Sequence, residues 1–143
     1  MKQALVANTG GLLRAIARRP NGLPAWPEYE KALVKASLVV IPSLILTEID
    51  YFLRDHRPIM RKLVAEIFDP STTYEFEPAT PADVARALLL DAKFSALGLG
   101  LVDGTVAAVA ERRRIYRVLT TDRADLGPLR IGEKYRKSLT LVP

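Results

Sequence analysis

The chain contains no cysteine and only one histidine and one tryptophan among its 143 residues. Without cysteine there is no disulfide framework, no thiol nucleophile and no metal site built from thiolates. This composition is compatible with a reducing compartment, and we expect a cytoplasmic location. The single histidine, His56, follows an acid at a helix end, and we expect it to be structural or solvated. Any metal ligands in this chain are therefore expected to be oxygen atoms.

Long hydrophobic runs are also missing. No apolar stretch approaches the ~20 residues that a membrane span needs, and the apolar residues near the N-terminus are too few for a signal peptide. We therefore expect no contact with a membrane. Hydrophobic residues make up 49% and charged residues 26% of the chain, which is typical of a folded domain. The length fits one domain, 1–143, and the net charge of +5 favours a polyanion or an acidic protein as partner.

Short apolar or alternating runs predict strands at 2–7, 38–41, 72–77, 116–119 and 139–142, the last of them at a sheet edge. Amphipathic segments between these runs predict helices, among them one at 44–55. Strands that alternate with helices are typical of an α/β domain with a mainly parallel central sheet flanked by helices.

Four polar residues are predicted to gather at one edge of this sheet. Asn8 and Asp122 each follow a predicted strand, and Glu48 lies in the helix after the second strand. Asp103 lies in the first turn of the helix that precedes the strand at 116–119. In open α/β sheets ligands bind outside the carboxyl ends of the strands, so these side chains are expected to converge there.

A cluster of carboxylates needs a cation, because like charges repel and raise each other's pKa. Oxygen ligands favour Mg²⁺ or Mn²⁺ over zinc. The pattern therefore predicts a metal site formed by Asn8, Glu48, Asp103 and Asp122. Such a site suits phosphoryl transfer, in which the metal activates water and neutralises charge on the leaving oxygen.

Each of these residues also has an ordinary structural interpretation. Asp103 fits a first-turn acid of a helix, Asp122 fits a turn, and Asn8 fits a cap after a strand. Glu48 is harder to explain in this way, because large apolar residues lie one turn before and one turn after it. Taken together, the four residues favour the metal site.

Other polar and aromatic residues receive simpler interpretations. We expect Asp125 to be a cap or surface acid rather than a further ligand, and Arg112–Arg114 to be a solvated helix end. Arg123 is the better candidate for a phosphate contact, because it adjoins Asp122. The aromatic residues near the expected site are predicted to lie in the core or in an interface: Trp26, Tyr51 and Phe52.

Four fragments carry a resemblance to a known family: LVANTGGLLRAI, IPSLILTEIDYFLRD, LGLVDGTVAAVAER and VLTTDRADLGPLR. In this order, over nearly the whole chain, they resemble a PIN-domain ribonuclease, more narrowly a VapC-type toxin of a toxin–antitoxin pair. The resemblance implies that Glu48 is the helical acid of the site, Asp103 its third acid and Asp122 the acid of a Thr-x-Asp turn. Thr9 and Thr120 match hydroxyls that flank the site.

The resemblance also implies a function and partners. It implies a PIN-like fold and Mg²⁺-dependent endoribonuclease activity, in which a metal-activated water cleaves an RNA phosphodiester. It further implies a homodimer and a VapB-type antitoxin that lies in an apolar groove near the site. The helices around Trp26 and 51–53 are the expected walls of that groove.

This chain departs from the family at the first site position, where Asn8 replaces an aspartate. An amide brings no negative charge, so we expect weak metal binding and little activity. Two explanations remain open: a deliberate replacement that allows a toxic nuclease to be produced, and a naturally quiet homologue. The alternative function is a catalytically inert PIN-like module that binds RNA or protein. A phosphate-accepting receiver or small phosphohydrolase ranks lower, because no pair of acids follows the first strand.

Overall fold

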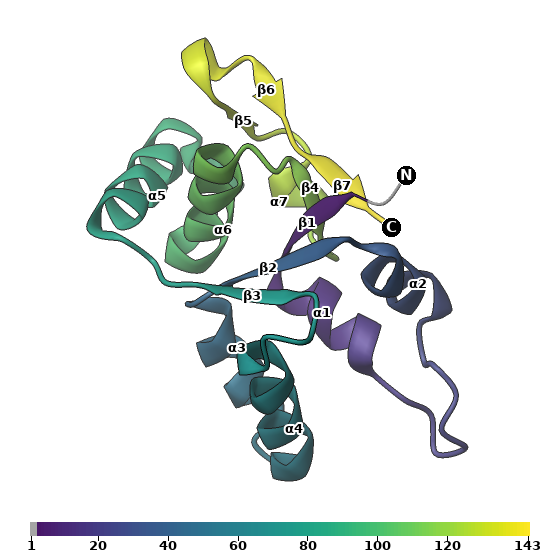
Figure 1. Ribbon diagram of the computed structural model, residues 1–143. Helices are drawn as coiled ribbons and strands as arrows, with labels where there is room; N and C mark the ends of the chain where they lie inside the picture. Colours follow the sequence, from purple (N-terminus) through teal and green to yellow (C-terminus); the bar gives the residue numbers. More distant parts are fainter. Residues whose placement is uncertain (1–2) are drawn as a thin grey trace.

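Five parallel strands form the central sheet in the computed structural model, which describes residues 3–143 (Figure 1). Their order across the sheet is β3-β2-β1-β4-β7, and every neighbouring pair is parallel. The bounds are β1 (Ala4–Ala7), β2 (Leu38–Pro42), β3 (Tyr74–Glu77), β4 (Arg117–Leu119) and β7 (Thr140–Val142). The α/β class with a parallel sheet is confirmed, as is the edge position of the last strand. Lys2, where the first strand is predicted to begin, lies outside the described residues.

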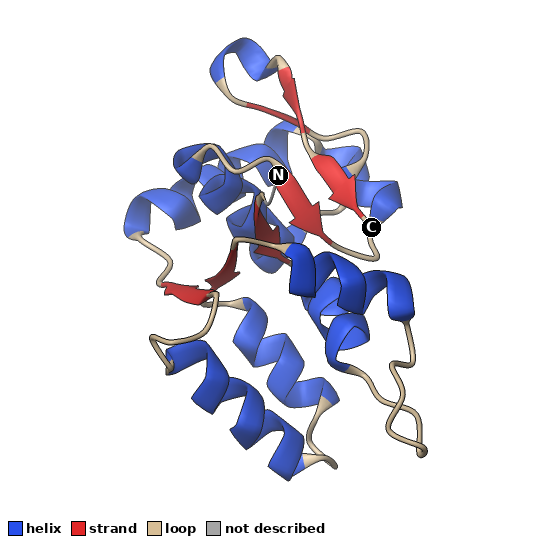
Figure 2. Ribbon diagram, turned by 45° about the vertical axis from the view of Figure 1, so that its right-hand side comes forward, coloured by secondary structure: helices blue, strands red, loops and turns tan. Residues whose placement is uncertain are grey.

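Helices cover both faces of the sheet, an arrangement consistent with a PIN-like fold. Figures 1 and 2 show α5 and α6 on one face and α1 to α4 on the other. The α-helices are α1 (Thr9–Ile16), α2 (Pro27–Lys35), α3 (Ile45–Phe52), α4 (Arg57–Phe68), α5 (Pro81–Lys93), α6 (Gly100–Arg113) and α7 (Arg123–Leu126). Short 3₁₀ turns, η1 (Ser95–Leu97) and η2 (Glu133–Tyr135), complete the helical part. No helix within residues 3–143 has both the length and the apolar character to cross a bilayer.

The direction of the chain across the sheet explains this division. The chain moves from β1 through β2 to the edge strand β3, and then returns past β1 to β4 and β7. Because parallel connections are right-handed, helices before and after this reversal lie on opposite faces. Adjacent strands β1 and β4 are therefore followed by connections that leave in opposite directions. This is the switch point at which α/β proteins bind ligands.

The core is formed by strands that are buried on both faces. Leu5, Val6 and Ala7 of β1 are fully enclosed, and β2 and β4 are similar, which explains their continuous apolar runs. On the face covered by α5, the helix α6 is buried from Gly104 to Ala110. Gly104 allows this close packing, because a side chain there would press against Ala87 of α5.

The structure differs from the expected local structure in three places. The helix predicted at 44–55 is shorter, because α3 ends at Phe52. A small antiparallel hairpin, β5 (Arg130–Ile131) with β6 (Lys137–Ser138), was not predicted. Of the two places predicted for the site aromatics, the core is wrong, because Trp26, Tyr51 and Phe52 are 44%, 61% and 57% exposed; their place in an interface stays a prediction. Helix α3 is so short that only two of its residues, Ile45 and Ile49, are buried.

Candidate acidic site

Asn8 links the end of β1 to the end of β4. Its backbone N–H donates to the carbonyl of Leu119 at 2.9 Å, which continues the pairing of Ala7 with Leu119. Its side-chain oxygen accepts from Thr9 N at 2.9 Å and caps α1. Its side-chain nitrogen donates to Thr120 Oγ1 at 3.1 Å and to Asp103 Oδ1 at 3.3 Å. Asn8 is thus a helix cap that also presents its amide donors to a neighbouring acid.

The two glycines after Thr9 allow α1 to begin directly beside β4. A Cβ on Gly11 would overlap the carbonyl of Leu119, and a Cβ on Gly10 would overlap the side chain of Thr121. Larger residues at either position would push the start of α1 away from the end of β4. The glycines therefore bring Asn8 and the residues after β4 into one pocket.

Glu48 enters from the first turn of α3 and is held by a hydroxyl. Thr9 Oγ1 donates to Glu48 Oε1 at 2.5 Å, and the Thr9 side chain is itself buried. This hydrogen bond partly offsets the cost of placing a carboxylate among apolar residues. The family resemblance places Thr9 beside the site, and its contact with Glu48 is a specific structural role for that hydroxyl.

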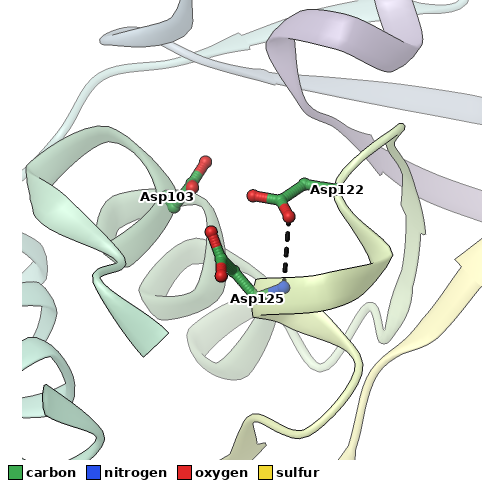
Figure 3. Close-up of side chains that lie close together, drawn as sticks. All are labelled: Asp103, Asp122 and Asp125. Carbon is green, nitrogen blue, oxygen red and sulfur yellow. Dashed lines mark hydrogen bonds between the residues drawn. The ribbon is translucent and has the colours of Figure 1, made fainter. Parts of the chain in front are cut away.

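Three further carboxylates lie together at the ends of α6 and α7: Asp103, Asp122 and Asp125. Each offers an oxygen within 4.8 Å of the others, and Figure 3 shows the three groups pointing toward one another. Asp122 caps α7 by accepting from Asp125 N at 3.1 Å, while Thr120 Oγ1 accepts from Asp122 N at 3.0 Å. We call these three residues the aspartate cluster.

Electrostatics within this cluster favour protonation. Burial is the largest cause that raises the pKa of Asp103 to about 6. The hydrogen bond from Asn8 opposes this shift, and the negative charges of Asp122 and Glu48 add to it. Burial and the neighbouring Asp122 likewise raise the pKa of Asp125. None of these carboxylates takes part in an ion pair within residues 3–143.

One pocket of about 490 Å³ brings the predicted residues together. Asn8, Glu48, Asp103 and Asp122 all line it, as the strand-end argument predicts. We call it the acidic pocket. Glu48 lies outside the close group of three aspartates, although its charge acts on Asp103. The assignment of these residues as metal ligands stays a prediction.

For Asp125 the cap interpretation is wrong, and for Arg123 the phosphate contact stays a prediction. Asp122 is the cap of α7, and the carboxylate of Asp125 joins the aspartate cluster. A spacing of three residues places Asp122 and Asp125 on one side of the start of α7, but it does not reveal the approach of Asp103. Arg123, the predicted phosphate contact, is exposed and donates to the carbonyl of Pro143 at 2.6 Å.

Acids on the opposite side of α6 are paired with arginine. The expectation that Arg112–Arg114 form a solvated helix end is wrong for two of the three. Arg112 donates to both oxygens of Asp83 at 2.9 Å, and Arg113 donates to Glu77 at 2.5 Å. These ion pairs join α6 to α5 and to β3, so the basic helix end is structural.

An apolar groove of about 810 Å³ adjoins the acidic pocket. Trp26, Phe52 and Leu53 line it, as expected for the groove walls, together with residues of α1 and α4. The groove and the acidic pocket share three lining residues: Leu13, Arg14 and Phe52. A long ligand that lies in the groove would thus pass these residues before it reaches the acids.

The donor set fits a hard divalent cation. The aspartate cluster offers oxygen atoms at close range, and the pocket lining contains no histidine. Among the described residues, its one basic lining residue is Arg14. Comparison of the chain with protein-family models and with curated proteins finds no match. The fold and the chemistry of the pocket are therefore the basis for assigning a function.

Proposed function

We propose that this chain is a Mg²⁺- or Mn²⁺-dependent endoribonuclease of the PIN-domain type, weakened by Asn8. The observation that carries the proposal is the aspartate cluster at the switch point of the sheet, to which no arginine or lysine among residues 3–143 is paired. Structural acids gain a cationic partner, as Asp83 does with Arg112. Acids that face one another without such a partner are expected where a cation binds.

Asp103, Asp122 and Asp125 would hold the cation, with Glu48 at the rim of the pocket. When bound, the cation supplies Lewis acidity, lowers the pKa of a water molecule and neutralises charge on the phosphate. Glu48 Oε1 accepts from Thr9, which leaves Oε2 to take a proton from the attacking water. The positive net charge of +5 draws the RNA backbone toward a pocket that its own acids would repel.

The hydrogen bonds of Asn8 explain why this residue would weaken metal binding at the site. Its oxygen is used by Thr9 N, so the amide presents N–H donors to Asp103 and Thr120. These donors satisfy one carboxylate without adding negative charge. An aspartate at this position would remove the donors and add one more negative charge, so the need for a cation would rise.

The direct test is RNA cleavage by the Asn8→Asp variant beside the unchanged chain, with Mg²⁺, Mn²⁺ or a chelator. We expect cleavage to rise by about 100-fold or more, comparable to the loss of a strong electrostatic group in other active sites. We also expect a larger thermal stabilisation by metal in Asn8→Asp, because ligands stabilise the folded state that binds them. Equal, negligible cleavage by both forms would count against the assignment of the site.

The second candidate is an inert PIN-like binding module. It is favoured by the hydrogen bonds of Asn8, which partly satisfy the acids without a cation. RNA that is bound but left uncut by Asn8→Asp in the presence of metal would support this function.

The proposed partners follow from the family resemblance and the groove. We propose that a short VapB-type antitoxin occupies the apolar groove, that the chain forms a homodimer, and that the pair acts in the cytoplasm. Supporting this, Trp26 and Phe52 are exposed on the groove walls. A stable stoichiometric complex with a short amphipathic peptide would support the proposal, whereas a monodisperse chain that ignores such peptides would weaken it.

A further inference from the structure

Arg14 and Phe52 lie where the apolar groove meets the acidic pocket. Arg14 is in the last turn of α1 and Phe52 is the last residue of α3, and both line both cavities. The other lining residue shared by the two cavities is apolar, Leu13. A cation and an aromatic ring therefore both line the part of the acidic pocket that adjoins the groove.

The guanidinium of Arg14 is held by aromatic rings rather than by acids. It lies 4.0 Å from the ring centroid of Trp26 and 5.4 Å from that of Tyr29. It makes no ion pair or side-chain hydrogen bond within residues 3–143, unlike Arg112, which is saturated by Asp83 and Glu77. Stacking fixes the plane of a guanidinium and leaves its N–H edge available, which is the arrangement that suits a phosphate.

Phe52 offers an aromatic surface to solvent. Its side chain is 57% exposed, and the ring of Tyr51 contacts it edge-on with centroids 5.8 Å apart. An exposed phenyl ring is costly in water and is the kind of surface on which unpaired nucleic-acid bases stack. Bases within a duplex are already stacked and are not available to such a ring.

We infer that Arg14 and Phe52 form a nucleotide subsite next to the acidic pocket. Arg14 contacts a backbone phosphate, and Phe52 stacks on the base of the neighbouring nucleotide. The inference rests on the proposed nuclease function and deepens it, because it names the residues of this chain that position the RNA beside the acids. A positive group at this entrance also separates the incoming phosphates from the carboxylates beyond.

The test measures binding of the unchanged chain, which is expected not to cut, to a short fluorescent single-stranded RNA with Mg²⁺. We expect Arg14→Ala and Phe52→Ala each to weaken binding by about tenfold, and Phe52→Tyr to retain it, because the tyrosine keeps a stacking ring. The control is Ile59→Ala, which removes an exposed apolar residue that lines the groove but not the acidic pocket. This control is expected to leave RNA binding unchanged.

Altered RNAs identify the two contacts separately. An abasic nucleotide at a single position should abolish the effect of Phe52→Ala, and a methylphosphonate at the neighbouring linkage should abolish that of Arg14→Ala. Double-stranded RNA should bind weakly and show no effect of Phe52→Ala. Equal losses for Phe52→Ala, Phe52→Tyr and Ile59→Ala would overturn the inference, because RNA binding would then not depend on a stacking ring at position 52.

The two proposals fail in different ways. If Asn8→Asp cuts no RNA but the position-dependent effect of Phe52→Ala persists, the nuclease proposal fails and the subsite stands. If Asn8→Asp cuts RNA while Arg14→Ala and Phe52→Ala bind normally, the subsite fails and the nuclease stands.

Discussion

Carboxylates gather on two sides of α6, and only one of the two groups is paired with arginine within residues 3–143. On one side lie the aspartate cluster and Glu48 of the acidic pocket, which have no arginine or lysine as an ion-pair partner within residues 3–143. On the other lies what we call the arginine-paired face, in which four acids meet three arginines. Its members are Glu75, Glu77, Asp83, Glu111, Arg86, Arg112 and Arg113.

The pKa values of one acid from each group show what this difference means. Burial disfavours the charge of Asp83, but hydrogen bonds from Arg112 and Thr80 outweigh it and lower the pKa of Asp83. Burial also disfavours the charge of Asp103, and there the neighbouring acids add to the effect and raise the pKa to about 6. The ionised form of an aspartate is thus stabilised on the arginine-paired face, as Asp83 shows, and destabilised in the acidic pocket, as Asp103 shows. The first arrangement supports the fold, and the second is the arrangement on which the proposed metal site depends.

The largest expected difference between the regions is in catalysis. In the Asn8→Asp background, Asp122→Asn should lower metal-dependent RNA cleavage by about 100-fold or more, exceeding the ~10–100-fold typical of residues that only orient metal ligands. Glu77→Gln, the matched change on the arginine-paired face, should leave cleavage within about twofold, because Glu77 lies outside the acidic pocket. Initial rates at saturating Mg²⁺ measure both, and similar losses for the two variants would contradict the division.

The next effect concerns stability. Arg112→Met should lower the free energy of unfolding by about 1–3 kcal/mol, because it leaves the carboxylate of Asp83 enclosed without its guanidinium. Arg61→Ala, which removes an exposed arginine without an ion pair within residues 3–143, should change it by less than about 0.5 kcal/mol. Urea denaturation at neutral pH gives both values. An equal effect of the two changes would mean that the arginine-paired face does not stabilise the fold.

The smallest effect is a pH dependence of opposite sign in the two regions, measured by thermal unfolding with a chelator present. Folding raises the pKa of Asp103 from 3.8 to about 6, so the folded chain binds an extra proton and gains stability as the pH falls from about 7 to 5. Allowing for solvent screening, we expect about 1 kcal/mol or less, or roughly 2–4 °C. Asp103→Asn should remove this rise.

The arginine-paired face should respond in the opposite direction and at lower pH. Folding lowers the pKa values of Asp83 and Glu111 below their ordinary values of 3.8 and 4.5. Their contribution to stability is present above those values and is lost as the pH falls through the folded pKa values. The prediction would be wrong if stability fell steadily from pH 7 downward, and fell identically in the unchanged chain and in Asp103→Asn. The two regions would then not differ in their electrostatics.

The periodicity of apolar residues in the sequence was sufficient to predict most of the fold. The continuous apolar runs predicted the buried strands of the sheet, and Asn8 and Asp122 were placed correctly because they directly follow strands. The β5–β6 hairpin was not predicted, because each of its strands has only two residues and shows no alternation. The exposure of Phe52 was also missed, because an apolar stripe does not reveal how short its helix will be.

Side-chain partners were the part that local sequence did not predict. Asp125 and Arg112 carry the same kinds of charge as many surface residues, and nothing adjacent in the chain distinguishes them. Asp125 faces Asp103 and Asp122, which have no ion pair within residues 3–143, while Arg112 reaches an acid 29 positions away in the sequence. Such partners depend on which helices pack together, which is a property of the whole fold.

The amino-acid order by itself determined the strands of the central sheet, their parallel arrangement and the polar residues that follow them, because hydrophobic period and chain breaks are local properties. Only the tertiary structure decided which acids meet an arginine and which meet one another. That outcome depends on the reversal of strand order beside β1 and on the glycines that bring α1 against β4, since electrostatic energy depends on distance in space.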